Sequence, residues 1–148
     1  MSHDPARVDA VTEKVIGCAI AVHRAMGPGL LESVYRSCMA VELKAENLAC
    51  EVEKRVALQY RGQDIAAGLT VDLLVEQCVI VELKAVERIH PVHLAQVITY
   101  LRLANCPAGL LLNFHTTSLR AGLRRLSHPD LYVKRHQRSA YARPGEEY

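Results

Sequence analysis

The chain has 148 residues, of which 50% are hydrophobic and 23% are charged, and its formal net charge is +2. This is the size and balance of one globular domain with a sizeable core. The apolar content excludes an intrinsically disordered chain, and 8 Gly and 6 Pro are too few for a collagen-like fibre. A charge so near neutral does not by itself indicate a nucleic-acid-binding protein.

The cysteines and the hydropathy of the sequence indicate in which cellular compartment the protein is expected. The five cysteines are odd in number and contain no CxxC pair, which predicts neither a disulfide framework nor a zinc ribbon. We interpret most of them as small buried hydrophobes. The N-terminus carries charges where a signal peptide would be apolar, and charges also interrupt the most apolar stretch, residues 69–86. We therefore expect a cytoplasmic protein without a membrane span.

The charge is unevenly distributed along the chain. Residues 1–115 hold 11 Lys and Arg against 13 Asp and Glu, whereas residues 116–148 hold 7 against 3. We predict a single domain over residues 1–127, followed by a basic C-terminal tail over residues 128–148. Such a tail is either a solvated segment or an arm that contacts phosphates, and charge alone does not choose between them.

Two helices are predicted first. Asp4 and Pro5 are typical of a helix start, and Gly27-Pro28-Gly29 ends the helical spacing that follows them. A second helix is predicted over residues 30–46. Its apolar side is expected to consist of Leu31, Val34, Cys38, Val41 and Ala45.

The remaining pattern predicts a sheet. Residues 50–60 read as an extended segment, residues 61–64 as a turn, and residues 67–75 and 79–84 as two strands. A third helix over residues 91–104 and a buried strand over residues 108–114 follow, while residues 119–126 fit either a strand or a helix. This order predicts an α/β fold with a mixed central sheet flanked by helices.

The two strands at residues 67–75 and 79–84 are the most informative part of the sequence. A turn centred on Gln77 places Asp72 directly opposite Glu82, with Cβ atoms about 4.5–5.5 Å apart. Lys84 lies on the same face, because side chains alternate along a strand. The other face would be apolar, with Val71, Leu73, Val75, Val79, Val81 and Leu83. A shift of one residue would bury both carboxylates, which favours this register.

Two neighbouring carboxylates destabilise a sheet unless positive charge compensates them, and Lys84 supplies one charge against two. A divalent cation such as Mg²⁺, held by two carboxylates together with water and a substrate phosphate, would supply the remainder. The alternative is a surface Asp–Lys–Glu cluster that solvent satisfies. The surrounding sequences, LTVDLLV and VIVELKAV, favour the cation site because they are typical of central strands.

Two further groups of polar residues are candidates for the same site. His93, Gln96 and Tyr100 share one stripe of the third helix, which can face the polar side of the hairpin or simply face solvent. Glu32 lies in the first turn of the second helix, where a carboxylate stabilises the helix dipole, and Tyr35 is a neighbour on the same surface.

Three segments together carry a resemblance to a known family. They are HRAMGPGLLESVY at residues 23–35, DLLVEQCVIVELKAVERIHPVHLAQVITYLRL at residues 72–103 and GLLLNF at residues 109–114. In order and spacing they resemble the GxxExxY family of small bacterial proteins, which belongs to the PD-(D/E)XK nuclease superfamily. The resemblance covers about residues 8–126. One departure is Val71, which stands where the motif has a proline.

The resemblance implies a restriction-endonuclease-like fold and a metal-dependent nuclease that hydrolyses DNA. It implies Asp72 and Glu82 as metal-binding carboxylates, the Leu83 carbonyl as a further ligand of Mg²⁺ or Mn²⁺, and Lys84 as the catalytic lysine. Glu32 resembles an acidic residue that an early helix contributes to catalysis or metal binding. Gln96 and Tyr100 resemble the QxxxY element that positions substrate. We add His93 and Tyr35 as candidate substrate-binding residues.

Two functions of different classes therefore remain open. The first is an active Mg²⁺-dependent deoxyribonuclease, which the joint presence of Asp72, Glu82 and Lys84 favours, because a pure binder has no need of carboxylates that repel phosphate. The second is a nuclease-like accessory module with little or no activity that binds nucleic acid or protein. RNA is a less favoured substrate because the few aromatic residues do not cluster. A homodimer is plausible for so small a nuclease.

Overall fold

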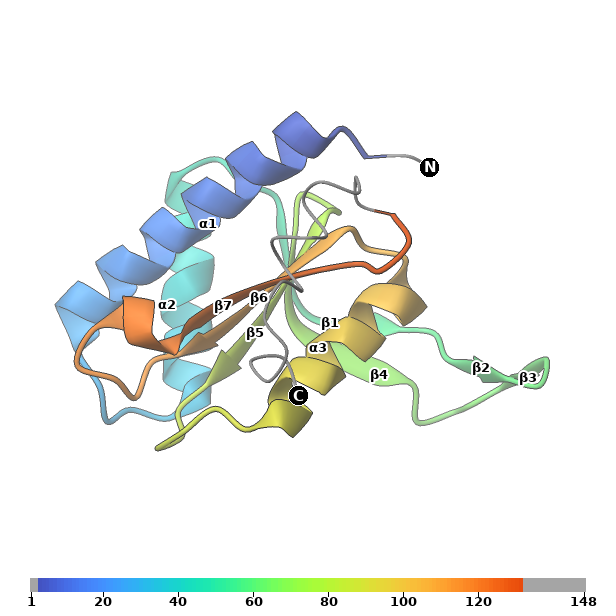
Figure 1. The fold of residues 1–148 in the computed structure, drawn as a ribbon. Coiled ribbons are helices and arrows are strands. Elements are labelled where there is room, and N and C mark those ends of the chain that lie inside the picture. Colours follow the sequence, from blue (N-terminus) through green and yellow to red (C-terminus); the bar gives the residue numbers. More distant parts are fainter. Residues whose placement is uncertain (1–2, 132–148) are drawn as a thin grey trace.

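The computed structural model describes residues 3–131, in which a five-stranded mixed sheet is covered by helices on both faces (Figure 1). The strand order is β1-β4-β5-β6-β7, with β5 and β6 parallel and the other neighbours antiparallel. This arrangement confirms the expected α/β class. The elements in chain order are α1 (Pro5–Met26), α2 (Glu32–Ala45), β1 (Cys50–Val56), β2 (Gln59–Tyr60), β3 (Gln63–Asp64), β4 (Leu69–Val75), β5 (Val79–Lys84), α3 (Pro91–Ala104), β6 (Ala108–Asn113), a 3-10 helix (Leu119–Gly122) and β7 (Leu123–Ser127).

The first helix begins and ends where the sequence predicts. The Asp4 side chain caps α1 by accepting a hydrogen bond from the Ala6 amide, and Gly27 ends the helix with a φ of 68°, which favours glycine. The valines of α1, together with Cys18 and Ala19, are buried against the sheet. Met26, the last residue of the helix, is 44% exposed.

The inward face of α2 differs from the prediction. Leu31 and Val41 are 74% and 69% exposed, whereas the buried residues are Tyr35, Met39 and Leu43. This helix carries two apolar stripes, and the i, i+4, i+8 stripe with the larger side chains is the one that packs on the sheet. Hydrophobic periodicity alone does not distinguish the two stripes.

The centre of the sheet separates two hydrophobic clusters. Strands β5 and β6 are buried almost throughout, as expected for parallel strands covered on both faces. One cluster joins the sheet to α1 and α2, and the other joins it to α3. Three of the five cysteines, Cys18, Cys78 and Cys106, are buried, and all five are free thiols.

Helix α3 lies close to the sheet because of a glycine in β6. A Cβ placed on Gly109 would lie 2.8 Å from Val97 Cγ1 and 3.2 Å from Leu101 Cδ2, so no side chain fits there. The helix has its predicted bounds and ends at Asn105, which adopts the left-handed conformation of a C-terminal cap.

Residues 119–126, which the sequence assigns to either a strand or a helix, contain one of each. Residues 119–126 form the 3-10 helix followed by most of β7. His128 is buried, and its amide donates a hydrogen bond to the Pro107 carbonyl. The rest of the predicted basic tail, residues 132–148, lies outside the described residues. Within residues 3–131, no helix has the length and apolar character needed to cross a membrane.

Candidate active site

The candidate site lies where β4 and β5 stop pairing. The ladder between them joins Val75 to Val79, Leu74 to Ile80 and Leu73 to Val81, which is the predicted register. The next opposed residues, Asp72 and Glu82, fall beyond the last backbone pair. The hairpin is thus closed at its turn and open at the two carboxylates.

Side chains replace the missing backbone hydrogen bonds at this opening. Asp72 Oδ2 accepts a hydrogen bond of 2.8 Å from the Leu83 amide, and Glu82 Oε1 accepts one of 3.0 Å from the Asp72 amide. Each carboxylate therefore binds the backbone of the opposite strand. This places the two carboxyl groups next to each other, as the sequence predicts.

The opening also changes which face one residue occupies. Val71 packs in the cluster beneath α3, whereas Leu73 packs in the cluster beneath α1 and α2. The prediction that both lie on one apolar face is wrong, because the alternation breaks at Asp72, which is turned toward β5. The other five residues of that predicted face are buried together, as expected.

Glu82 is the most strongly perturbed acid of the pair. Only 6% of the residue is exposed. Burial, and then the neighbouring charge of Asp72, raise the pKa of Glu82 from 4.5 to about 8, although the Asp72 amide and Lys84 act in the opposite direction. Glu82 is therefore largely protonated at neutral pH unless another cation enters the site. Such a shift is typical of functional sites.

Lys84 and the backbone of Leu83 complete this end of β5. Lys84 is the last residue of the strand and is half-buried. The Leu83 amide points toward Asp72, and the carbonyl of the same residue points to the same side of the strand. The carbonyl that the resemblance implies as a metal ligand is thus directed toward the two carboxylates.

Arg36 on α2 is a neighbour of Asp72 that sequence reasoning missed. Its Nη1 lies 3.3 Å from Asp72 Oδ1, and its Nη2 lies 2.7 Å from Glu53 Oε1. Glu53 has a φ of 52° and is left out of the β1–β4 ladder opposite Asp72, so the arginine bridges an interruption in that ladder. The only signal in the sequence is the i, i+4 spacing from Glu32 to Arg36.

The stripe on α3 faces the two carboxylates. Gln96 Nε2 donates a hydrogen bond of 3.0 Å to the Tyr100 hydroxyl. Burial, and then the charge of Glu82, raise the pKa of Tyr100, with a smaller contribution from Asp72. The phenol therefore lies within electrostatic range of both acids. Gln96 is exposed and Tyr100 is half-buried, so both are accessible to a ligand.

His93 joins Glu32 and Lys84 to the site. Burial, and then the charge of Lys84, lower the pKa of His93, whereas Glu32 raises it. The imidazole Nδ1 accepts a hydrogen bond from the His90 amide as part of a capping box. His93 therefore lies within electrostatic range of both Lys84 and Glu32.

Tyr35 does not belong to this group. The residue has no exposed surface, and its ring stacks on Phe114 with centroids 4.4 Å apart. Its hydroxyl donates to the Gly27 carbonyl and accepts from the Leu30 amide. The expected substrate contact is therefore wrong, because this side chain fixes the loop before α2 from within the core.

A second residue that the sequence analysis missed is Asn113, which holds the loop after Lys84. Its side chain accepts a hydrogen bond of 3.1 Å from the Val86 amide and donates one of 2.8 Å to the Val86 carbonyl. Asn113 lies opposite Lys84 in the β5–β6 register, so it fixes the backbone just beyond the lysine. Its position in the family-like segment GLLLNF was the available signal.

The oxygen atoms at this site suit a hard divalent cation that takes only a few of its ligands from the protein. Asp72, Glu82 and the Leu83 carbonyl offer oxygen ligands, and Mg²⁺ prefers one or two carboxylates with water and phosphate. Within residues 3–131, no three His, Cys, Asp or Glu side chains are close enough to hold an ion by themselves. The assignment of Glu32 to catalysis or metal binding stays a prediction.

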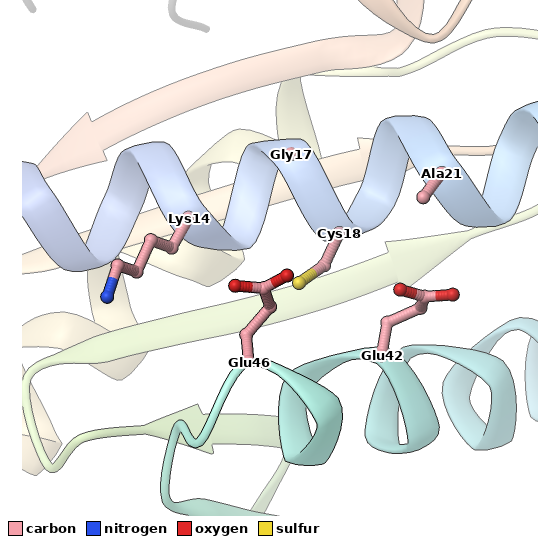
Figure 2. A pocket seen from close by; sticks show the side chains of 6 residues that line it. All are labelled: Lys14, Gly17, Cys18, Ala21, Glu42 and Glu46. Carbon is pink, nitrogen blue, oxygen red and sulfur yellow. The ribbon is translucent and has the colours of Figure 1, made fainter.

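A hollow of about 280 Å³ lies elsewhere, between α1 and α2 (Figure 2). It is lined by Lys14, Gly17, Cys18 and Ala21 of α1, by Glu42 of α2 and by Glu46, which follows the end of α2. Burial, and then Glu46 and Glu42, raise the pKa of the Cys18 thiol. Glu42 follows Glu32 by ten residues, about 15 Å along the helix, so this hollow is separate from the candidate site.

Comparison with known proteins identifies the family. A family model of the PD-(D/E)XK nuclease superfamily matches residues 9–126. The chain therefore belongs to the PD-(D/E)XK nuclease superfamily, and its mixed sheet flanked by helices has the fold expected of that superfamily. Membership implies a nuclease-like function and a nucleic-acid partner. No curated protein and no solved structure matches the chain.

Proposed function

We propose that the protein is a metal-dependent nuclease that hydrolyses phosphodiester bonds of DNA. The observation that carries this proposal is the pair of carboxylates at the open end of a buried hairpin. Asp72 and Glu82 are held by each other's strand, and Glu82 has a pKa of about 8. A structural ion pair would not need this like-charge juxtaposition, whereas a cation site does.

The resident ion is proposed to be Mg²⁺ or Mn²⁺, bound by Asp72, Glu82 and the Leu83 carbonyl. When bound, such an ion supplies Lewis-acid activation of the phosphate and lowers the pKa of a coordinated water. Glu82 gives up its proton as the site is loaded, because the added positive charge restores its acidity. The proposal thus assigns the raised pKa of Glu82 to the metal-free protein.

The remaining side chains are assigned to substrate and water. Lys84 orients the attacking water or stabilises negative charge that develops on the phosphate. Gln96 and Tyr100, joined by a hydrogen bond, contact the substrate backbone. His93 lies within electrostatic range of Lys84 and Glu32. We assign Glu32 to holding a water molecule and His93 to contacting a phosphate.

The family assignment is proposed at a finer level as well. Gly29, Glu32 and Tyr35 have the spacing of the GxxExxY motif. Their structural roles differ: Gly29 takes a φ of 103°, Glu32 lies near the site and Tyr35 anchors the loop. We propose membership of the GxxExxY family on this combination.

The second candidate is a nuclease-like module with little or no activity. The pairing of Arg36 with Asp72 favours it, because an arginine at a carboxylate opposes the entry of a metal ion. Under this alternative the same surface binds nucleic acid or protein without cutting. The two functions differ in one observable, which is metal-dependent cleavage.

The test is a cleavage assay on linear, circular and single-stranded DNA, with an RNA of the same sequence, in the presence and absence of Mg²⁺ or Mn²⁺. Wild type is compared with Asp72→Ala and Lys84→Ala, and Lys44→Ala removes an exposed lysine on α2 as a matched control. We expect cutting by wild type and by the control only. Cutting that requires no metal, or that all four proteins share, would contradict the enzyme proposal.

A further inference from the structure

The β2–β3 arm, which we define as residues 57–68, carries an exposed tyrosine and an exposed arginine that the fold does not use. Tyr60 is 68% exposed and Arg61 is also exposed. Within the described residues, neither side chain makes a hydrogen bond, an ion pair or a ring contact. The arm forms a two-stranded sheet of its own and extends away from the body of the protein (Figure 1).

The arm nevertheless has a defined conformation. Arg61 and Gly62 form a two-residue loop with φ values of 51° and 77°, the left-handed pair that suits the twist of a tight hairpin. At the base, the Arg55 guanidinium donates a hydrogen bond of 3.2 Å to the Ala66 carbonyl. The side chains at the tip are therefore presented by a braced hairpin rather than by an irregular loop.

The arm projects from the open end of the β4–β5 hairpin. It joins β4 at Leu69, three residues before Asp72, which corresponds to about 10 Å along an extended strand. The turn that closes the hairpin lies at the other end of β4, after Val75. A long ligand centred on the two carboxylates can therefore pass along the arm on one side.

Arg61 is the one cation within the arm, and Asp64 is the one acid. Two further cations lie in β1 at the base of the arm: Lys54, which pairs with Glu51, and Arg55. The carboxyl group of Asp64 accepts a hydrogen bond of 2.8 Å from Gln59, so it is already engaged within the arm. Arg61 at the tip is the cation best placed to contact a phosphate group.

We propose that the β2–β3 arm binds DNA on one side of the bond to be cut. Arg61 contacts a backbone phosphate, and Tyr60 packs its ring against a neighbouring nucleotide. This inference rests on the proposed nuclease function and adds a substrate surface outside the residues assigned to the site. It predicts that DNA recognition extends beyond the nucleotides that touch the two carboxylates.

The test uses the double variant Tyr60→Ala/Arg61→Ala and the control Arg102→Ala. Arg102 is an exposed arginine in the last turn of α3, which leads to β6 beside Val79 at the closed end of the hairpin. Binding is measured with a 30-base-pair duplex, each variant being placed in a Lys84→Ala background to prevent cutting. Hydrolysis of bis(p-nitrophenyl) phosphate, which is too small to reach the arm, is measured with Lys84 intact.

We expect the double variant to bind the duplex about tenfold more weakly, because it loses a phosphate contact and an aromatic contact. The salt dependence of binding should also fall, its log–log slope decreasing by roughly 0.9 for one lost phosphate contact. Hydrolysis of the small phosphodiester should be unchanged, and the Arg102→Ala control should bind like its parent.

Unchanged duplex affinity and an unchanged slope, in a protein that cuts DNA, would overturn the role of the arm and leave the nuclease proposal in place. An equal loss of affinity in the Arg102→Ala control would also overturn it, because the effect would then be one of overall charge. Failure of the nuclease proposal gives a different result, in which wild type neither cuts DNA nor hydrolyses the small phosphodiester with any metal.

Discussion

The two ends of the β4–β5 hairpin use the same two strands in different ways. At the closed end, residues 73–75 pair with residues 79–81 through the backbone, and their side chains pack into the core. At the open end, the amides of Asp72 and Leu83 bind carboxylates instead. The closed end therefore stabilises the fold, and the open end holds charged groups that chemistry can use.

The largest expected effect is on activity at the open end. Glu82→Gln should reduce metal-dependent DNA cleavage by about three orders of magnitude, because bound metal contributes several kcal/mol of charge stabilisation. The free energy of unfolding of the metal-free variant at pH 7 should be higher than that of wild type, because folded Glu82 holds a proton that the unfolded chain has released, whereas glutamine carries no such cost. Cleavage rates and urea unfolding check the two statements, with the exposed Glu87→Gln as control. Retained cleavage would contradict the assignment of Glu82.

The second effect is on stability at the closed end. Leu73 is fully buried, and Leu73→Ala should lower the free energy of unfolding by about 2–5 kcal/mol through lost burial and a cavity. The folded fraction of this variant should still bind Mn²⁺ as wild type does. Chemical denaturation and calorimetry measure both properties. A variant that kept its stability but lost metal affinity would contradict the view that the closed end serves stability and the open end serves metal binding.

The third prediction concerns pH in the absence of divalent metal. Between pH 4.5 and about 8, folded Glu82 keeps a proton that the unfolded chain has released, so the unfolded state gains relative to the folded state as pH rises. The free energy of unfolding should fall over this interval by on the order of a few kcal/mol. Other groups titrate there too, so the measured quantity is the difference between wild type and Glu82→Gln in urea at pH 5, 7 and 8.5. A difference that does not change with pH would show that Glu82 is ionised throughout.

The smallest predicted effect concerns Arg36 at the border of the open end. Arg36→Met should lower the free energy of unfolding of the metal-free protein by about 1–2 kcal/mol, since it removes a charged hydrogen bond to Asp72 and an ion pair with Glu53. The same change should tighten Mn²⁺ binding severalfold, because a competing cation leaves Asp72. Titration calorimetry measures the affinity, and Lys44→Met serves as the control on the same helix. Weaker metal binding would mean that Arg36 supports the site rather than competing with the ion.

Local patterns in the sequence predicted most of the framework. Asp4, Pro5 and Gly27 define α1, and the alternation of apolar residues defines the register of the closed end. The neighbourhood of Asp72 and Glu82 also follows from that register, because direct opposition in a hairpin is a short-range property. The stripe on α3 was predicted from helical spacing, but that spacing left open whether the stripe faces the carboxylates or solvent.

The features that were missed depend on long-range contacts. Arg36 meets Asp72 only because α2 packs beside an interruption of the β1–β4 ladder, and that interruption has no signature in the sequence. Tyr35 was placed in the site because it neighbours Glu32 on the helix, but Tyr35 faces the core whereas Glu32 is partly exposed. Val71 changed faces because strand alternation assumes an unbroken ladder.

The absence of a side chain at Gly109 determines how closely helix α3 approaches the sheet, and with it the position of the α3 residues at the site. Helix α3 carries the hydrogen-bonded pair of Gln96 and Tyr100, and its height above the sheet is fixed where Val97 and Leu101 rest on that glycine. A larger residue would clash with Val97 and Leu101, so these side chains or the helix that carries Gln96 and Tyr100 would have to shift. A residue without a side chain thus determines how far Gln96 and Tyr100 lie from the two carboxylates.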